Sequence, residues 1–226
     1  MPSRHRNVLT AAQRHTLTEP PADLASLVRH YTLTPEDRAI IDRHRRPRNR
    51  LGFAIQLCYL RFPGHMLRPE EDVPASLLAF VAEQLGVDAA VFGQYARRGA
   101  TRYNHLAELQ STYGFRSFTQ DRYRELAGQL LPTALANDHL PWLIGAALEA
   151  MRQHRIIVPV LTVVERLCAE VRLHARRQVF KSLAQGLTAA QKAALDGLLL
   201  AAVMTSAFPA RSSLRTLDGL CAAAWA

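Results

Sequence analysis

The chain has 226 residues, 49% of them hydrophobic, and a formal net charge of +9 at pH 7. This hydrophobic content excludes a disordered tail, and the length allows one or two domains with a substantial core. No apolar run reaches the ~18–20 residues that a membrane-spanning helix needs, and the N-terminal residues lack the apolar segment of a signal peptide. We therefore expect a cytoplasmic protein that contacts no membrane.

The positive charge is concentrated in two parts of the chain. Residues 1–70 carry a net charge of +6 and residues 151–181 one of +5, whereas residues 71–150 carry −3. Two basic blocks around an acidic middle favour a polyanionic partner. All but two of the 28 basic residues are arginine, which binds phosphates and guanine edges through a planar fork. GC-rich coding would produce the same preference for arginine, so the preference carries little weight alone.

Cysteine, histidine and motif spacing indicate no metal site, no disulfide and no cofactor. The three cysteines, Cys58, Cys168 and Cys221, are far apart in the sequence, and buried free thiols are expected. The nine histidines form no ligand-spaced pair. The chain lacks the HExxH, CxxC and GxSxG motifs and a phosphate-binding glycine loop. Neither a catalytic residue nor a small-molecule ligand is predicted.

The spacing of capping residues and apolar residues predicts an all-α fold. Helices are expected over residues 10–19, 22–30, 34–46, 47–62, 74–85, 88–96, 101–113, 119–136, 140–154, 162–184 and 188–202. Capping boxes at residues 10–13, 162–165 and 188–191 open three of them. The apolar run over residues 51–60 predicts a helix buried on most sides, with a strand as the alternative.

The first turn of this apolar helix is strongly basic. A helix with a buried body and a basic start is typical of a DNA-binding helix that meets the groove with its N-terminus. A core helix with a solvated basic start gives the same pattern, and the two interpretations carry equal weight. The candidate DNA contacts are Arg45, Arg46, Arg48, Asn49 and Arg50.

Two further groups are candidate DNA contacts. The first is a helix start where arginines accompany aromatic and polar side chains, with Arg97, Arg98, Arg102, Tyr103 and His105 as candidates. A solvated helix start explains that group equally well. The second is the basic face of the long helix over residues 162–184, with Arg172, Arg176 and Arg177 as candidate backbone contacts. A solvated charged face is the favoured interpretation there.

The predicted organisation is a tandem of small bundles, similar to helix-turn-helix units, followed by a long basic helix. Residues 1–70 form a helical DNA-binding unit, residues 71–138 a second helical unit, and residues 139–202 a helical extension. Residues 203–226 lose the helical pattern and are expected to be a poorly ordered tail.

Six stretches resemble, in the same order, the N-terminal region of replicative transposases of the Tn-three family of class II bacterial transposons. The match is strongest over residues 49–63, and the resemblance covers about residues 9–200. The stretches are LTAAQR (9–14), LVRHYTLTPEDRAII (27–41), RPRNRLGFAIQLCYLRFPG (46–64), FVAEQLGVD (80–88), HLAELQSTYGFRSFT (105–119) and IIVPVLTVVERLCAE (156–170).

The resemblance implies a helical region that binds the terminal inverted repeats of a transposon, as double-stranded DNA, through small helix-turn-helix-like domains in tandem. In that family the catalytic core is a separate RNase H-like domain with an acidic triad and a divalent metal. No position of this chain matches the triad, so the resemblance transfers no catalytic residue. It implies a bacterial, nucleoid-associated protein that does not cut or join strands.

Two other functions stay open from the sequence. A helical interaction module that docks onto a full-length transposase would form a mixed oligomer without DNA. An inert remnant of a decayed transposase would bind neither partner.

Overall fold

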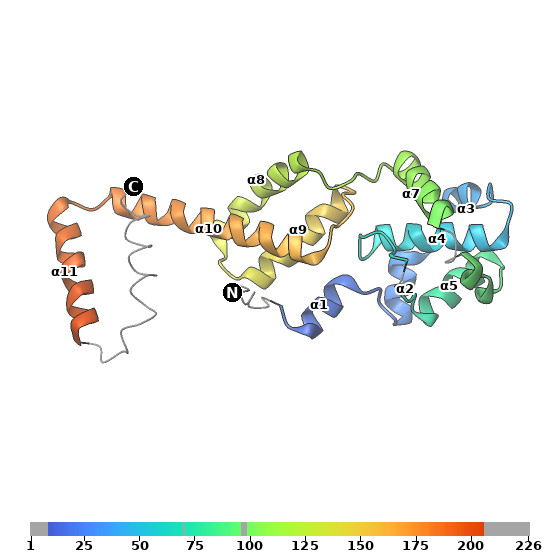
Figure 1. The fold of residues 1–226 in the computed structure, drawn as a ribbon, viewed down its shortest axis with the longest axis horizontal. Helices are drawn as coiled ribbons and strands as arrows, with labels where there is room; N and C mark the ends of the chain where they lie inside the picture. The colour runs from blue at the N-terminus through green and yellow to red at the C-terminus, as the bar shows by residue number, and fades with distance from the viewer. Residues whose placement is uncertain (1–8, 70, 96–98, 206–226) are drawn as a thin grey trace.

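The computed structural model describes residues 9–69, 71–95 and 99–205, with residues 199–205 described by their backbone alone. Within these ranges every regular element is helical, which confirms the predicted all-α fold (Figure 1). The elements are α1 (Ala11–Thr18), α2 (Leu24–Tyr31), α3 (Pro35–Ile41), α4 (Pro47–Arg61), α5 (Ala75–Leu85), a 3₁₀ turn η1 (Ala89–Val91), α6 (Phe92–Tyr95), α7 (Gly99–Tyr113), α8 (Gln120–Ala136), α9 (Leu140–Gln153), α10 (Leu161–Gln185) and α11 (Ala189–Thr205).

Side-chain caps set several of these helix starts. Thr10 and Gln13 form the predicted capping box at α1, and Thr188 and Gln191 form the one before α11. The capping box predicted at residues 162–165 is wrong, because α10 begins at Leu161 and no side chain caps it. The carboxylate of Glu165 instead accepts a hydrogen bond from Arg14 Nη2 at 2.6 Å, which ties α1 to α10.

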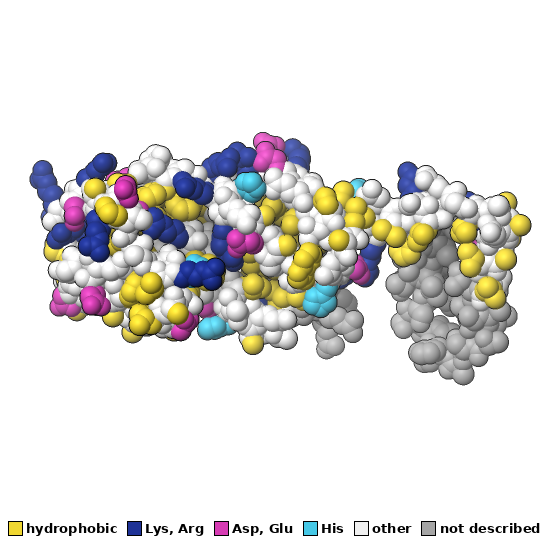
Figure 2. Space-filling model, turned by 180° about the vertical axis from the view of Figure 1, so that it is seen from behind, with side chains coloured by type: hydrophobic (Ala, Val, Ile, Leu, Met, Phe, Trp, Pro, Cys, Tyr) yellow, Lys and Arg dark blue, Asp and Glu magenta, His cyan; other side chains and the backbone are white. Residues whose placement is uncertain are grey.

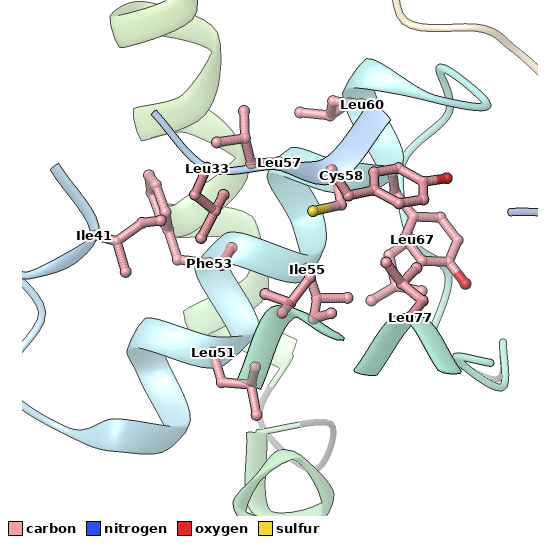
Figure 3. Packing of buried hydrophobic residues seen from close by; sticks show 14 of the residues in the cluster. Leu33, Ile41, Leu51, Phe53, Ile55, Leu57, Cys58, Leu60, Leu67 and Leu77 are labelled. Carbon is pink, nitrogen blue, oxygen red and sulfur yellow. The ribbon is translucent and has the colours of Figure 1, made fainter. Parts of the chain in front are cut away.

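The first hydrophobic core is built around α4. Every residue from Leu51 to Leu60 is buried, so the predicted helix is enclosed by its neighbours on all sides, and Gln56 is its one polar side chain in this segment. Helices α2, α3, α5, α6 and α7 all contact it. Figure 3 shows Leu33, Ile41, Leu67 and Leu77 from other segments around the side chains of α4.

The second hydrophobic core is a three-helix bundle of α8, α9 and α10. Leu9 belongs to this second core, so the N-terminal segment packs against residues more than a hundred positions away. Along the chain, Phe115 is the last buried member of the first core and Phe118 is the next residue that packs against the second, although Ile157 also packs against the first. The cluster membership therefore changes near these two residues, and the expected domain boundaries after residues 70 and 138 stay predictions.

Backbone hydrogen bonds join the two cores. Val158 N donates to Gly64 O at 2.9 Å, while Arg116 N donates to Arg155 O and Ile157 N to Arg116 O, both at 2.8 Å. Arg152 Nε donates to Pro63 O at 3.0 Å, and its guanidinium lies 4.7 Å from the ring centroid of Phe62. Arg152, from the second basic block of the sequence, therefore has a structural role.

The end of α10 and the whole of α11 extend beyond the second core as an arm, here residues 176–205 (Figure 1). The buried apolar side chains of α10 extend only as far as Ala175. Phe180 and Leu183 on α10 are 55% and 65% exposed, and Leu198 on α11 is 68% exposed. The expected tail, residues 203–226, overlaps α11 at residues 203–205, and the remainder lies outside the described residues.

No single described helix is long and apolar enough to cross a membrane. One bent pair, Ala75–Leu85 with Ala89–Tyr95 at 110°, meets the length and composition criteria when taken together.

Candidate nucleic-acid interface

A strongly basic corner joins α3 to α4. Residues 42–50 contain five arginines and a single acidic residue, Asp42. We call this segment the arginine corner. On the face shown in Figure 2, most lysine and arginine side chains lie over the half of the molecule that holds the first core, whereas the arm exposes hydrophobic side chains.

The backbone of the corner also favours an anion. Pro47 occupies the first turn of α4, and Arg46 is its N-cap residue without a side-chain cap hydrogen bond. The amino end of a helix carries free N–H groups and a partial positive charge, both of which attract phosphate. Because the body of α4 is buried, only this first turn can meet a duplex.

The arginines of the corner differ in how they are held. Arg45 and Arg46 are exposed, and neither side chain has a partner within the described part of the chain. Arg48 Nη1 donates to Gln94 Oε1 at 3.0 Å. Arg50 Nη1 lies 3.4 Å from Asp42 Oδ1, and Arg50 Nε is buried without a hydrogen-bond partner among the described residues. The two arginines of the first turn, Arg48 and Arg50, are thus oriented by neighbours, whereas Arg45 and Arg46 are free to follow a ligand.

The predicted contacts on α7 need correction. Arg102 is 8% exposed, and its Nη2 donates to Leu67 O at 2.9 Å. His105 is 5% exposed and its Nδ1 lies 3.0 Å from the Tyr95 hydroxyl. Neither side chain presents a polar group to a duplex, so both leave the candidate interface. Tyr103 is 69% exposed, while Arg97 and Arg98 lie outside the described residues.

The candidates on α10 are partly engaged with an acidic residue. The Asp138 carboxylate pairs with Arg176 and lies 3.9 Å from Arg172 Nε. Arg176 lowers the pKa of Asp138 by hydrogen bonding to it, so the carboxylate stays ionised. Arg177 is exposed, and it has no partner within the residues that the structure describes.

A buried polar cluster lies directly behind the arginine corner and was not predicted. Gln56 Nε2 donates to the Tyr95 hydroxyl at 2.6 Å, and that hydroxyl reaches His105 Nδ1. The rings of His44 and His105 are 4.6 Å apart. Gly52 allows this arrangement, because a Cβ there would come within 3.0 Å of three ring atoms of Tyr95. A lone glycine in an apolar helical run was the available indication of such a close approach.

The cluster predicts a loss of stability in mild acid. Burial, with His44 as a second cause, lowers the pKa of His105 from 6.5 to about 4. The unfolded state therefore binds more protons between these two pH values, and the free energy of unfolding falls as pH drops from about 6.5 to about 4. One such histidine contributes at most about 1.4 kcal/mol per pH unit.

Urea unfolding across this pH window measures the effect, and the variant His105→Gln should flatten the profile while keeping an acceptor for Tyr95. The exposed His139 supplies a control substitution, His139→Gln, which should leave the slope unchanged. An identical slope in the His105→Gln variant would contradict the assignment.

Comparison with known proteins identifies the family. The sequence model of a family described as a domain of unknown function, DUF4158, matches residues 8–171. The chain belongs to the DUF4158 family. The matched range contains both the arginine corner and the polar cluster behind it, and it ends just before Arg172 on α10.

Relatives of this DUF4158 chain are transposases, which confirms the resemblance seen in the sequence. The chain is 41% identical to the transposase of transposon Tn21 from Escherichia coli over 194 residues, which are 86% of this chain and 20% of that protein. It is 38% identical to the Tn501 transposase of Pseudomonas aeruginosa over 194 residues, which are again 86% of this chain and 20% of that protein. It is 33% identical to the Tn1546 transposase of Enterococcus faecium over 96% of this chain and 22% of that protein. The DUF4158 chain spans about a fifth of the length of these relatives.

No three histidine, cysteine, aspartate or glutamate side chains lie close enough to hold a metal ion within the described parts of the DUF4158 chain. Cys58 and Cys168 are buried free thiols, as expected, and burial raises the pKa of each to about 12.

Proposed function

We propose that the chain binds the terminal inverted repeats of a transposon through the arginine corner and takes part in transposition without cutting or joining strands itself. The observation that carries this proposal is the placement of five arginines against one aspartate at the uncapped amino end of a buried helix. The transposase relatives support it, because a transposase has to recognise DNA. Its place of action is the bacterial cytoplasm, in association with the nucleoid.

The contacts divide by how each arginine is held. Arg45 and Arg46, which are exposed and unpaired within the described residues, suit the phosphate backbone. Arg48 is half-buried and oriented by Gln94, which suits a base edge in the major groove. Asn49, half-buried beside it, is a second candidate for a base edge. Arg177, Tyr103 and the partly paired Arg172 and Arg176 stay as proposed backbone contacts outside the corner.

Fluorescence anisotropy tests this division. The probes are a duplex of the terminal repeat beside the chain's own coding sequence, the Tn21 repeat, and a random duplex, each at two salt concentrations. Replacing Arg45 and Arg46 with alanine should weaken binding to all three duplexes and reduce the slope of log affinity against log salt by about 1 for each phosphate that is no longer neutralised. Arg48→Ala should instead cost about 1–3 kcal/mol for repeat DNA alone.

The control is Arg124→Ala. Arg124 lies on the outer face of α8, where its side chain is 71% exposed and paired with Asp121. Its removal should change neither the affinity for DNA nor the salt dependence of binding. Equal affinity of the unmodified chain for repeat and random duplexes would rule out the proposed function.

A second candidate function is docking onto a full-length transposase, and the arm favours it. Leu183, Leu195 and Leu198 are large apolar side chains that are 65%, 47% and 68% exposed, and exposed apolar groups along a helix are typical of a protein interface. Size-exclusion chromatography of the chain mixed with a full-length transposase, without DNA, would show a mixed oligomer. An inert remnant would show neither the oligomer nor DNA binding.

A further inference from the structure

We infer that Gln94 is a positioning residue for Arg48, holding the guanidinium at the mouth of α4 in the orientation in which it meets a base edge. This inference rests on the proposed function and adds the source of its specificity. Gln94 comes from α6 and is 46 positions away in the sequence, yet its Oε1 accepts a hydrogen bond from Arg48 Nη1 at 3.0 Å.

The neighbour of Gln94 sets its backbone position, while the side chain of Gln94 itself is exposed. Tyr95 is 1% exposed, its ring lies against Gly52, and its hydroxyl accepts a hydrogen bond from Gln56 Nε2. Arg48, Gly52 and Gln56 are spaced by four residues and therefore lie along one face of α4. Tyr95 contacts Gly52 and Gln56 on this face. The adjacent Gln94 therefore lies beside Arg48, one turn earlier on α4.

The chemistry of the partner matters as much as its position. A carboxamide is neutral, so it orients the guanidinium without cancelling its charge. Arginine has further N–H donors in its planar fork, and these stay available for a guanine edge. Asp42 holds Arg50 in a different way, since its carboxylate offsets the positive charge of that residue. The corner therefore contains one arginine that is oriented with its charge uncompensated, and that arginine is Arg48.

Preorientation should appear as discrimination between DNA sequences. An arginine free to rotate loses side-chain entropy when it binds a base edge, whereas one already oriented loses less. Gln94→Ala should therefore lower the preference for repeat over random DNA and leave the affinity for random DNA unchanged. A weaker attraction to phosphate would instead reduce both affinities.

A double-mutant cycle on the full chain tests the inference. Arg48→Ala should reduce affinity for the repeat duplex roughly tenfold, and Gln94→Ala should reduce it about threefold. The double variant should match Arg48→Ala alone, because Gln94 has nothing to orient once Arg48 is removed. Gln94→Glu should bind repeat DNA less well than Gln94→Ala, because the carboxylate would pair with Arg48 and repel phosphate. The matched control is Gln110→Ala. The carboxamide of Gln110 also makes a side-chain hydrogen bond, but its partner is the neutral hydroxyl of Ser117, to which it donates at 2.9 Å.

The outcomes separate this inference from the proposed function. If Arg48→Ala weakens repeat binding while Gln94→Ala does not, or if the two effects add in the double variant, the positioning role is wrong and the proposed function stands. If Arg48→Ala has no effect, the positioning role is also wrong, because there is no contact to orient. If the unmodified chain shows no preference for repeat DNA, both fail. Circular dichroism spectra and thermal melts of each variant establish that the fold is intact.

Discussion

Replacing Gly52 with alanine should lower the free energy of unfolding by about 3 kcal/mol. The added Cβ would come within 3.0 Å of three ring atoms of Tyr95, and this ring is buried and fixed by Gln56 and His105. Since the ring cannot turn aside, α6 must move away from α4. The same movement would take Gln94 from Arg48, so selectivity for repeat DNA should decline together with stability.

Denaturant unfolding monitored by circular dichroism measures this change. Gly128→Ala is the matched control, because Gly128 also lies inside a helix but an added Cβ there would meet nothing within 4 Å. That variant should be more stable by up to about 1 kcal/mol, since alanine favours the helix more than glycine does. Two glycine-to-alanine changes in one protein should thus have opposite signs. A stabilised Gly52→Ala variant would contradict the packing of Tyr95 on α4.

The second large effect is expected at Asp37, where Asp37→Asn should cost about 3 kcal/mol. Asp37 is 2% exposed, and its carboxylate accepts hydrogen bonds from Arg61 Nη2 at 2.7 Å, Tyr113 Oη at 3.0 Å and Thr34 N at 2.9 Å. It therefore joins the start of α3 to the end of α4 and to α7. Without the carboxylate, the guanidinium of Arg61 would stay partly buried with no counter-charge.

The pH dependence of this site follows from the direction of its pKa shift. Burial alone would raise the pKa of Asp37, but hydrogen bonds from Arg61, Thr34 and Tyr113 outweigh it and the net shift is downward. A carboxylate with a lowered pKa stabilises the fold above its unfolded value of 3.8, and this contribution is lost as pH falls through the folded pKa. Asp37→Asn should abolish that acid-dependent part of the stability profile.

Asp42→Asn provides the control for Asp37. Asp42 also pairs with an arginine, Arg50, but its side chain is 60% exposed and the distance is 3.4 Å. A solvated pair of this kind contributes under about 1 kcal/mol. An equal loss of stability in the two variants would show that burial does not set the strength of the Asp37 site.

The elements that local pattern determines were predictable from the sequence. The apolar run of α4, interrupted by Gly52 and Gln56, and the capping boxes before α1 and α11 depend on residues within a few positions of one another. The arginine corner was also visible, because its charge lies within nine consecutive residues, 42–50.

Long-range packing was not predictable in the same way. Arg102 and His105 were predicted at the interface because arginines beside aromatic and polar side chains at a helix start can bind phosphates and base edges. Their spacing with the buried Leu109, at i, i+3 and i+7, places all three on the inward face of α7. Likewise, nothing near Glu165 in the sequence indicates that its partner is Arg14. Such pairings depend on the tertiary fold, which a single sequence read in short windows does not contain.

The main-chain bonds between Gly64 and Val158 and between Arg116 and residues 155–157 have a consequence for how a duplex could approach. They join the two cores through direct backbone contacts rather than through an extended linker. The corner and Arg177, which lies on α10 two residues beyond its last buried position, are therefore held at a set offset. A double helix touching both would have to adapt its own curvature to the protein, and flexible base steps between the two contacts would ease that adaptation.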